Sequence, residues 1–222
     1  MRGRRNSWVA LAVLLVGGSA FATDVKTLLA AVEHTARFPV PVRADVGSDR
    51  GAGFVLLARH DVIRLELPDG TRVLARRAKA IAWSKGRLRG FDPTARPPGL
   101  PLALEDLLPF DAGRLRMPQI SDESPAGVVV TAAPSRRSSH VLLVFTIDPE
   151  RGVVTKTQFY RDTINNMVAL RRDGDFVTVG ERPRARATTI EYLLENATTR
   201  WTVSWREAPE LAANAFTPAG LR

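Results

Sequence analysis

The stretch VLLVFTIDPERGVVTKTQFYRD, residues 141–162, decides the fold that the sequence predicts. Two runs rich in β-branched and aromatic residues, Val141 to Asp148 and Val153 to Arg161, flank the turn-like segment Pro149-Glu150-Arg151-Gly152. Each run has the length and composition of a β-strand. Because a parallel crossover needs about a dozen residues or more, so short a connection predicts an antiparallel pair.

The same pattern extends through the rest of the C-terminal half. Short connectors, among them Asp173-Gly174, Arg182-Pro183 and Asn196-Ala197, separate further runs of strand-like composition. Connections of this length predict an antiparallel meander. The seven strands predicted here are Val128 to Ala132, Val141 to Asp148, Val153 to Arg161, Asn165 to Arg172, Phe176 to Glu181, Thr188 to Glu195 and Thr199 to Arg206.

The N-terminal half predicts one short helix followed by another set of strands. Asp24 can accept hydrogen bonds from the free N–H groups of a first helical turn, and an apolar stripe follows from Val25 to Ala36. Pro39 and Pro41 end this helix, and Asp69-Gly70 predicts a hairpin turn. We expect about five strands from the candidates Val40 to Val46, Phe54 to Ala58, Val62 to Leu67, Arg72 to Arg76, Lys79 to Trp83 and Arg87 to Phe91.

Between the two halves lie a loop rich in proline and glycine and the segment LALEDLLPF, Leu102 to Phe110. That segment predicts a short amphipathic helix whose buried side chains Leu104, Leu107 and Leu108 would act as a lid. A second loop is expected from Gly113 to Gly127, and Pro209 can start a last short helix around Glu210 to Asn214. The resulting fold class is α+β but mostly β. A sheet of about 11–12 antiparallel strands would curl and close, or nearly close, with short helices over its mouth.

The N-terminus has the three parts of a cleavable secretory signal. Arg2, Arg4 and Arg5 precede an apolar run, and Ala20-Phe21-Ala22 fits a small-x-small cleavage site. A membrane anchor is the alternative, but the apolar run is shorter than the roughly 20 residues that a span needs. We expect cleavage after Ala22, and no lipidation because the chain contains no cysteine. The predicted product is a single periplasmic domain of residues 23–222.

The charge of the chain is strongly basic. It is +9 at pH 7 for the whole sequence and +6 once the three arginines of the signal are removed. A basic surface suits anionic partners such as lipid headgroups, lipopolysaccharide or nucleic acid. Export argues against nucleic acid. The basic residues are also scattered among acidic ones, so an ordinary solvated surface is the competing interpretation.

Candidate catalytic and metal-binding residues are few. A nucleophilic triad could be drawn from Ser139, His140 and Asp148, but no nucleophile elbow accompanies them. Neighbouring acids such as Glu105 and Asp106 point in different directions on a helix, which predicts surface charge. No zinc-ligand spacing or phosphate-binding glycine loop is present in the sequence. We therefore expect a protein that is not an enzyme and that uses no metal and no cofactor.

The apolar side chains of the C-terminal strands remain as binding candidates. They line either an ordinary core or a cavity for acyl chains, because both environments select the same residue types. The candidates are Leu143, Phe145, Ile147, Phe159, Val168, Leu170, Ile190, Tyr192, Trp201, Val203 and Trp205.

The order and spacing of several short motifs resemble the LolA/LolB-like superfamily of outer-membrane lipoprotein-sorting proteins, in its divergent and functionally unassigned branch. The motifs are PLALEDLLPF (Pro101 to Phe110), FTIDPERGVVTKTQFYRD (Phe145 to Asp162), GERPRARATTIEYLLENATTRWTV (Gly180 to Val203) and NAFTPAGL (Asn214 to Leu221). The resemblance covers most of residues 24–222 and is loosest in the first half. The basic run from Arg182 to Arg186 departs from it.

This resemblance implies an incomplete β-barrel with an apolar cavity, and no catalytic residue. The function that it implies is a periplasmic carrier or chaperone for lipid or lipoprotein acyl chains, in lipoprotein sorting or lipid transport. Its partners would be an inner-membrane transporter or an outer-membrane acceptor, with transient contact to anionic membrane surfaces. The alternative is an envelope sensor that binds lipid or protein in the same cavity and signals through a partner. A lipid hydrolase is a third class, disfavoured by the lack of a credible triad.

Overall fold

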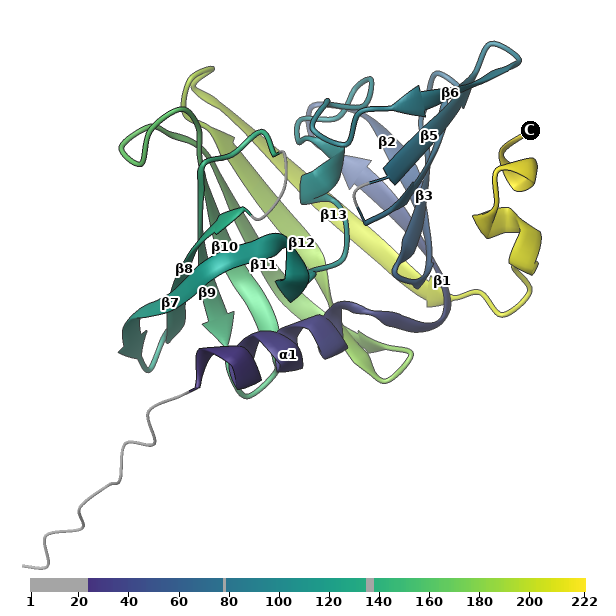
Figure 1. Cartoon of the computed structure of the whole chain (residues 1–222). Coiled ribbons are helices and arrows are strands. Elements are labelled where there is room, and N and C mark those ends of the chain that lie inside the picture. The colour runs from purple at the N-terminus through teal and green to yellow at the C-terminus, as the bar shows by residue number, and fades with distance from the viewer. Residues whose placement is uncertain (1–23, 78, 135–137) are drawn as a thin grey trace, which may run out of the picture.

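The computed structural model describes residues 24–77, 79–134 and 138–222, so the predicted signal peptide lies outside the described residues. Thirteen strands form one antiparallel sheet in the order β6-β5-β4-β3-β2-β1-β13-β12-β11-β10-β9-β8-β7 (Figure 1). The strands are β1 (Phe38–Ser48), β2 (Gly51–His60), β3 (Val62–Glu66), β4 (Arg72–Arg76), β5 (Lys79–Ser84), β6 (Arg87–Phe91), β7 (Leu115–Ser124), β8 (Gly127–Pro134), β9 (Leu142–Asp148), β10 (Val153–Tyr160), β11 (Met167–Val179), β12 (Arg182–Tyr192) and β13 (Ala197–Glu207).

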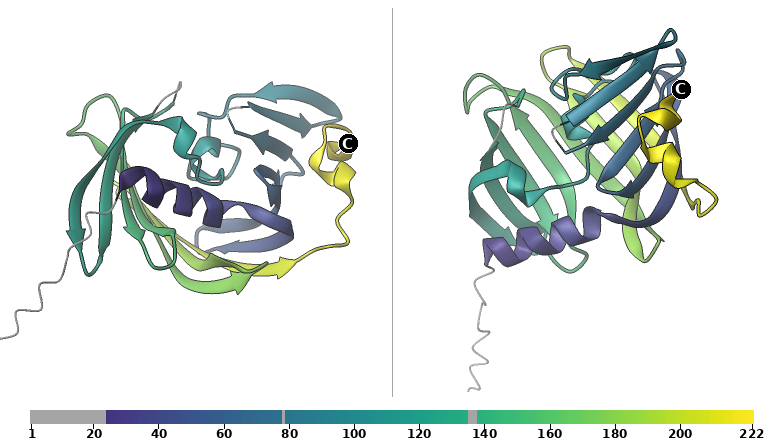
Figure 2. Two further views of the ribbon diagram at one scale, coloured as in Figure 1. Left: turned by 60° about the horizontal axis from the view of Figure 1, so that its bottom comes forward. Right: turned by 45° about the vertical axis from the view of Figure 1, so that its right-hand side comes forward.

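Strands β1 and β13 join the two halves of the sheet. Ala44 lies opposite Trp205 and Val46 lies opposite Val203 in this pair. Strands β6 and β7 stand at the two ends of the order, so the sheet curls without closing. Figure 2 shows the curled sheet with the helix α1 and the segment before β7 on its concave side. The predicted mostly-β, incomplete antiparallel barrel is confirmed.

Helix α1 (Val25–Ala36) forms where the sequence predicted it. The Asp24 carboxylate accepts hydrogen bonds from the backbone N–H groups of Thr27, at 3.0 Å, and Lys26, at 3.3 Å. The apolar stripe of α1 packs on the inner face of β8 and β9, in a cluster made of Leu28, Leu29, Val32, Val128, Val130, Phe145 and Ile147. Within the described ranges, no helix has the length and apolar content to cross a membrane.

Strand β11 runs unbroken through Asp173-Gly174, where the sequence predicted a turn. Asp173 lies opposite Thr188, and its carboxylate accepts a hydrogen bond from the Thr188 hydroxyl at 2.6 Å, which accounts for an aspartate inside a strand. The turn falls instead at Gly180-Glu181, where both φ angles are positive, at 55° and 62°. Such angles are typical of a tight hairpin. Two predicted strands are therefore one, and Arg182-Pro183 begins β12.

Strand β7 occupies most of the segment predicted as the loop from Gly113 to Gly127. Its side chains are mainly polar and exposed, so the period-two pattern that marks a half-buried strand is missing. Pro118 lies in it at a register shift between Arg116 and Gln119. Proline is tolerated there because β7 is an edge strand.

The structure differs from the prediction at both short helices expected after α1, the one between the two halves and the last one. The segment Leu102 to Phe110 holds only one 3-10 turn, η1 (Leu104–Asp106). The N–H groups of Leu104 and Glu105 donate to the carbonyls of Ala95 and Pro93, so the preceding loop satisfies the start of this turn in place of an earlier helical turn. The last helix is replaced by two further 3-10 turns, η3 (Ala213–Phe216) and η4 (Ala219–Leu221).

Candidate functional site

Two adjoining chambers lie between the sheet, α1 and the segment that precedes β7. The first chamber has a volume of about 350 Å³ and the second about 220 Å³. Leu108, Pro109 and Phe110 line both chambers, as does the Arg171–Asp173 pair. Pockets for small molecules measure about 300–1,000 Å³, so this space is of the size that binds a ligand.

The structure places six of the predicted cavity residues on these two linings. Leu143, Phe145 and Phe159 line the first chamber. Trp201, Val203 and Trp205 line the second, beside aromatic rings from the other half of the sheet. The Trp205 ring stacks on Phe38, with centroids 6.0 Å apart, and Trp201 meets Phe54 edge-on at 5.4 Å. The second chamber is therefore built where β1 meets β13, from residues of both halves.

The other five predicted cavity residues line neither chamber. Ile147 and Ile190 are fully buried in the packed clusters. Val168 and Tyr192 border a separate small pocket of about 50 Å³. Leu170 is paired with Gln158 and Glu191, so it faces away from the chamber that its neighbour Arg171 lines.

The three predicted lid residues also lie in different surroundings. Leu104 is fully buried in the core and lines neither chamber. Leu107 lines the second chamber, and Leu108 lines both. The lid is therefore an extended segment after η1 rather than a helix.

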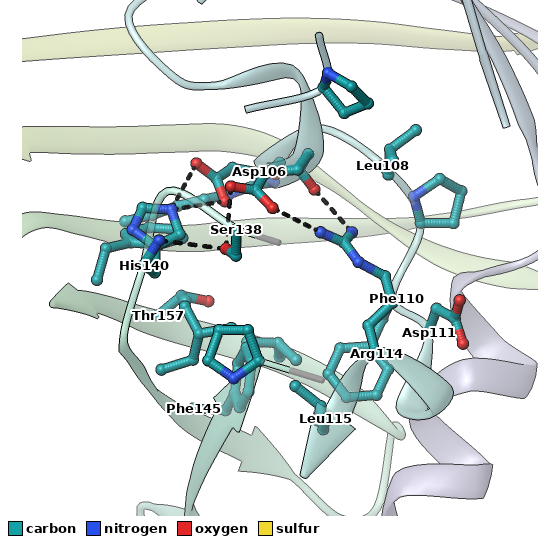
Figure 3. Close-up of a pocket in the computed structure, with 18 of the residues that line it drawn as sticks. Asp106, Leu108, Phe110, Asp111, Arg114, Leu115, Ser138, His140, Phe145 and Thr157 are labelled. Carbon is teal, nitrogen blue, oxygen red and sulfur yellow. Dashed lines mark hydrogen bonds and ion pairs between the residues drawn. The ribbon is translucent and has the colours of Figure 1, made fainter. Parts of the chain in front are cut away.

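A buried polar cluster forms one end of the first chamber, opposite Phe110, Leu115 and Phe145 (Figure 3). The Glu105 side chain is only 3% exposed, so the prediction of surface charge was wrong. Its Oε1 accepts hydrogen bonds from the hydroxyls of Ser138, at 3.0 Å, and Ser139, at 2.7 Å, and from the Ser139 N–H at 2.8 Å. Its Oε2 pairs with Arg114 at 3.0 Å. The carboxylate is thus fully satisfied inside the protein.

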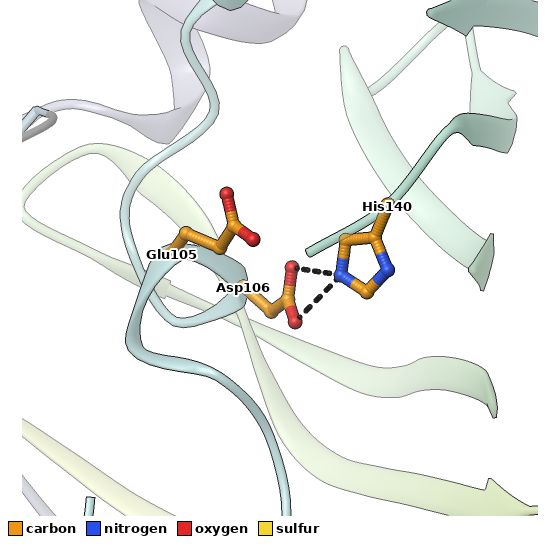
Figure 4. Close-up of side chains that lie close together, drawn as sticks. All are labelled: Glu105, Asp106 and His140. Atoms are coloured by element: carbon orange, nitrogen blue, oxygen red, sulfur yellow. Dashed lines mark hydrogen bonds and ion pairs between the residues drawn. The ribbon is translucent and has the colours of Figure 1, made fainter. Parts of the chain in front are cut away.

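His140 and Asp106 form the second half of this cluster (Figure 4). The His140 Nε2 lies 3.1 Å from both Asp106 carboxylate oxygens and 3.1 Å from the Ser139 hydroxyl. Burial raises the pKa of the Asp106 carboxyl, and the hydrogen bond from His140 opposes that rise. A nucleophilic triad needs serine on one ring nitrogen and the carboxylate on the other. Here both share Nε2, while Nδ1 is buried and has no hydrogen-bond partner in the described part of the chain, so the geometry differs from a triad.

The same three side chains could offer ligand atoms to a metal ion. One ligand atom from each of Glu105, Asp106 and His140 lies within 4.8 Å of the others. Both oxygens of Glu105 are already engaged by two serines and Arg114, however. A metal would have to displace these partners, so a hydrogen-bonded polar wall describes the cluster better.

The second chamber carries two arginines with different surroundings. The Arg171 Nε donates to the Asp173 carboxylate at 2.8 Å, so this charge is neutralised beside the chamber. Arg184 is 7% exposed, and among the described residues no carboxylate forms an ion pair with it. Burial lowers the pKa of Arg184 to about 10, which leaves it charged at neutral pH.

Sequence reasoning missed both of these polar features. Glu105 and His140 belong to segments 34 or more residues apart, and only the sheet brings them together. The adjacency of Ser138, Ser139 and His140 at a strand start was the available local signal. For Arg184 the signal was the basic run from Arg182 to Arg186, of which only Arg184 is buried.

Comparison with solved structures supports the class of fold that this geometry defines. A domain from Vibrio parahaemolyticus described as an outer membrane lipoprotein-sorting protein matches with a TM-score of 0.69 at 14% identity, over 89% of this chain and 99% of that one. A LolA superfamily protein from Nitrosomonas europaea matches with a TM-score of 0.66 at 15% identity, over 88% and 98%.

A DUF1329 family protein from Desulfovibrio piger matches with a TM-score of 0.70 at 11% identity, over 88% of this chain and 97% of that one. No protein-family model and no curated protein sequence matches the chain. The chain has a divergent LolA-like fold, and the resemblance predicted from its motifs is confirmed at the level of the fold.

Proposed function

We propose that the protein is an exported carrier that holds an acyl chain of a lipid or lipoprotein in its two chambers. The observation that carries this proposal is the pair of adjoining chambers, whose linings join aromatic and aliphatic side chains from both halves of the sheet. Each methylene that leaves water contributes about 0.8 kcal/mol, so these surfaces would bind a chain without forming a covalent bond. The N-terminal signal predicted from the sequence supports a periplasmic site of action.

A binding role without catalysis is part of the proposal. His140, which lines the first chamber, shares its Nε2 between Ser139 and Asp106, which supports a structural role for this polar wall. The Leu108-Pro109-Phe110 segment contacts both chambers and belongs to no helix or strand. Movement of this segment would admit and release the cargo, as a carrier requires.

Tryptophan fluorescence tests the carrier proposal. Trp201 and Trp205 line the second chamber, so titration of the delipidated protein with a long-chain lipid should shift their emission. Trp205→Phe should remove part of this shift, because the change deletes one reporter and keeps an aromatic ring. Trp83→Phe is the matched control, since Trp83 lies on β5 with its ring against Arg72. Flat emission while an independent method detects bound lipid would place the lipid elsewhere, and no binding at all would refute the carrier.

Contact with anionic membranes is a further expectation of the carrier. Ile164 is 66% and Leu194 is 69% exposed, and they lie on the β10–β11 and β12–β13 turns, at the same end of the sheet. The mature charge of +6 would attract an anionic surface. We expect flotation with anionic vesicles to exceed that with neutral vesicles and to fall as salt rises, since the Debye length is about 8 Å at physiological ionic strength. Equal flotation with both vesicle types would contradict this expectation. Leu194→Ser should weaken vesicle binding, whereas the control Leu88→Ser on β6 should not.

A further inference from the structure

Arg184 is a buried charge whose hydrogen-bond partners are all neutral carbonyl groups. Its Nη1 donates to the carbonyl oxygens of Thr35, at 2.8 Å, and Pro183, at 3.3 Å, and its Nη2 donates to the carbonyl of Arg37 at 2.6 Å. Its Cζ lies 4.2 Å from the centroid of the Phe38 ring. Carbonyl dipoles and an aromatic face stabilise a cation, but they leave its net charge uncompensated.

The guanidinium also keeps unused hydrogen-bonding capacity. A guanidinium has five N–H donors, and the three bonds to carbonyls leave two of them. One of these is on Nε, which is buried and has no partner among the described residues. Charge-assisted pairing with a carboxylate or phosphate uses two such donors in parallel.

The position of Arg184 ties this charge to the cavity. Arg184 lines the second chamber together with Phe38, Trp201 and Trp205. The other charged side chains on that lining, Arg171 and Asp173, neutralise each other. Arg184 is therefore the charged lining residue of this chamber that lacks a counter-ion among the described residues.

We propose that Arg184 binds the anionic oxygen head of an acyl amphiphile whose tail occupies the chambers. This inference rests on the carrier function and adds the ligand class, which is a chain ending in a carboxylate or a phosphate. The tail would extend from Arg184 past Trp205 and Trp201 and under the Leu108-Pro109-Phe110 segment into the first chamber. The head would supply the negative charge that the protein itself does not place beside Arg184.

Matched ligands of equal chain length test the head-group preference. Palmitate, hexadecyl phosphate and methyl palmitate would each compete with a fluorescent fatty-acid probe for the mature protein, below their aggregation concentrations. We expect the two anions to bind roughly ten- to a hundredfold more tightly than the ester, as one charged hydrogen-bonded pair allows. The ratio of palmitate to hexadecyl phosphate then distinguishes a carboxylate head from a phosphate head.

Substitutions assign the preference to one side chain. Arg184→Met should abolish the advantage of the anions and leave ester binding within about twofold, because methionine keeps an apolar side chain of similar length at this place in the lining. Arg186→Met is the control, since Arg186 is an exposed arginine on the same strand, paired with Asp175. Arg184→Lys keeps the charge but lacks the parallel N–H donors of a guanidinium, so it should retain part of the preference. It serves as the test variant if Arg184→Met does not fold.

The possible outcomes distinguish the proposed role of Arg184 from the carrier function on which it rests. Equal affinity of the wild-type protein for acid and ester overturns the role of Arg184 and leaves the carrier intact. A preference for the anions that survives in Arg184→Met or is undiminished in Arg184→Lys also overturns it. Failure of all three ligands to bind refutes the carrier itself.

Discussion

Glu105→Ala is expected to lower the free energy of unfolding by about 3–5 kcal/mol, which is the range for removing one partner of a buried ion pair. The Glu105 carboxylate accepts three hydrogen bonds from Ser138 and Ser139 and pairs with Arg114. Alanine would leave the Arg114 charge and these donors without their acceptor beside a largely apolar chamber. Urea unfolding followed by circular dichroism measures the loss.

Two further variants define the cause of this loss. Glu105→Gln keeps an oxygen for the serines but replaces the charge that faces Arg114, so its cost should fall between those of wild type and Glu105→Ala. Glu195→Ala is the control, because Glu195 forms an exposed ion pair with Arg96 at 3.2 Å. Such a pair contributes about 0.2–1 kcal/mol. A loss below about 1 kcal/mol for Glu105→Ala would mean that the cluster does not stabilise the fold.

Leu221→Ala should cost about 2–5 kcal/mol, although Leu221 lies one residue from the end of the chain. Leu221 is fully buried, and the carbonyls around it are held by arginines of the sheet. The Arg64 Nη1 donates to the carbonyls of Ala215, at 3.2 Å, and Gly220, at 2.7 Å. The Arg72 Nη1 donates to the carbonyl of Leu221 at 3.2 Å. The terminal segment thereby covers β3 and β4 from the side away from α1 (Figure 1).

Leu88→Ala supplies the comparison for this substitution. Leu88 lies on the edge strand β6 and is 41% exposed, so its truncation should cost much less. Lipid binding should be unchanged in Leu221→Ala under conditions where the variant is folded, because Leu221 lines neither chamber. Equal costs for the two leucines would show that the terminal segment is not anchored as the structure indicates.

The two chambers depend on different parts of the fold. The first lies mainly against β9, β10 and the segment that follows η1. The second exists because β1 pairs with β13, which brings Phe38 and Phe54 against Trp205 and Trp201. A chain that enters both chambers would therefore contact residues from nearly the whole length of the protein.

Local sequence alone determined the helix and most strands. The cap at Asp24 and the stripe from Val25 to Ala36 specify α1 within one segment. Short connectors such as Pro149 to Gly152 specify antiparallel neighbours, since the chain has no length for a crossover. These signals act over a few residues, and they identified β4 and β6 to the residue.

Local signals failed where a distant partner decides the conformation. Asp173-Gly174 has the composition of a turn, yet Thr188 on β12 binds the Asp173 carboxylate and keeps it in a strand. β7 has no fully buried side chain, and its conformation depends on its pairing with β8.

Tertiary structure alone decided the polar features of the site. Ser139 is 34 residues from Glu105, and Arg184 is 149 residues from the Thr35 carbonyl that it binds. Because Glu105 is buried it forms part of a polar wall, and because Arg184 is buried it forms a charged part of the chamber lining. Burial depends on how the whole sheet curls around α1, and no short stretch of sequence records that curvature.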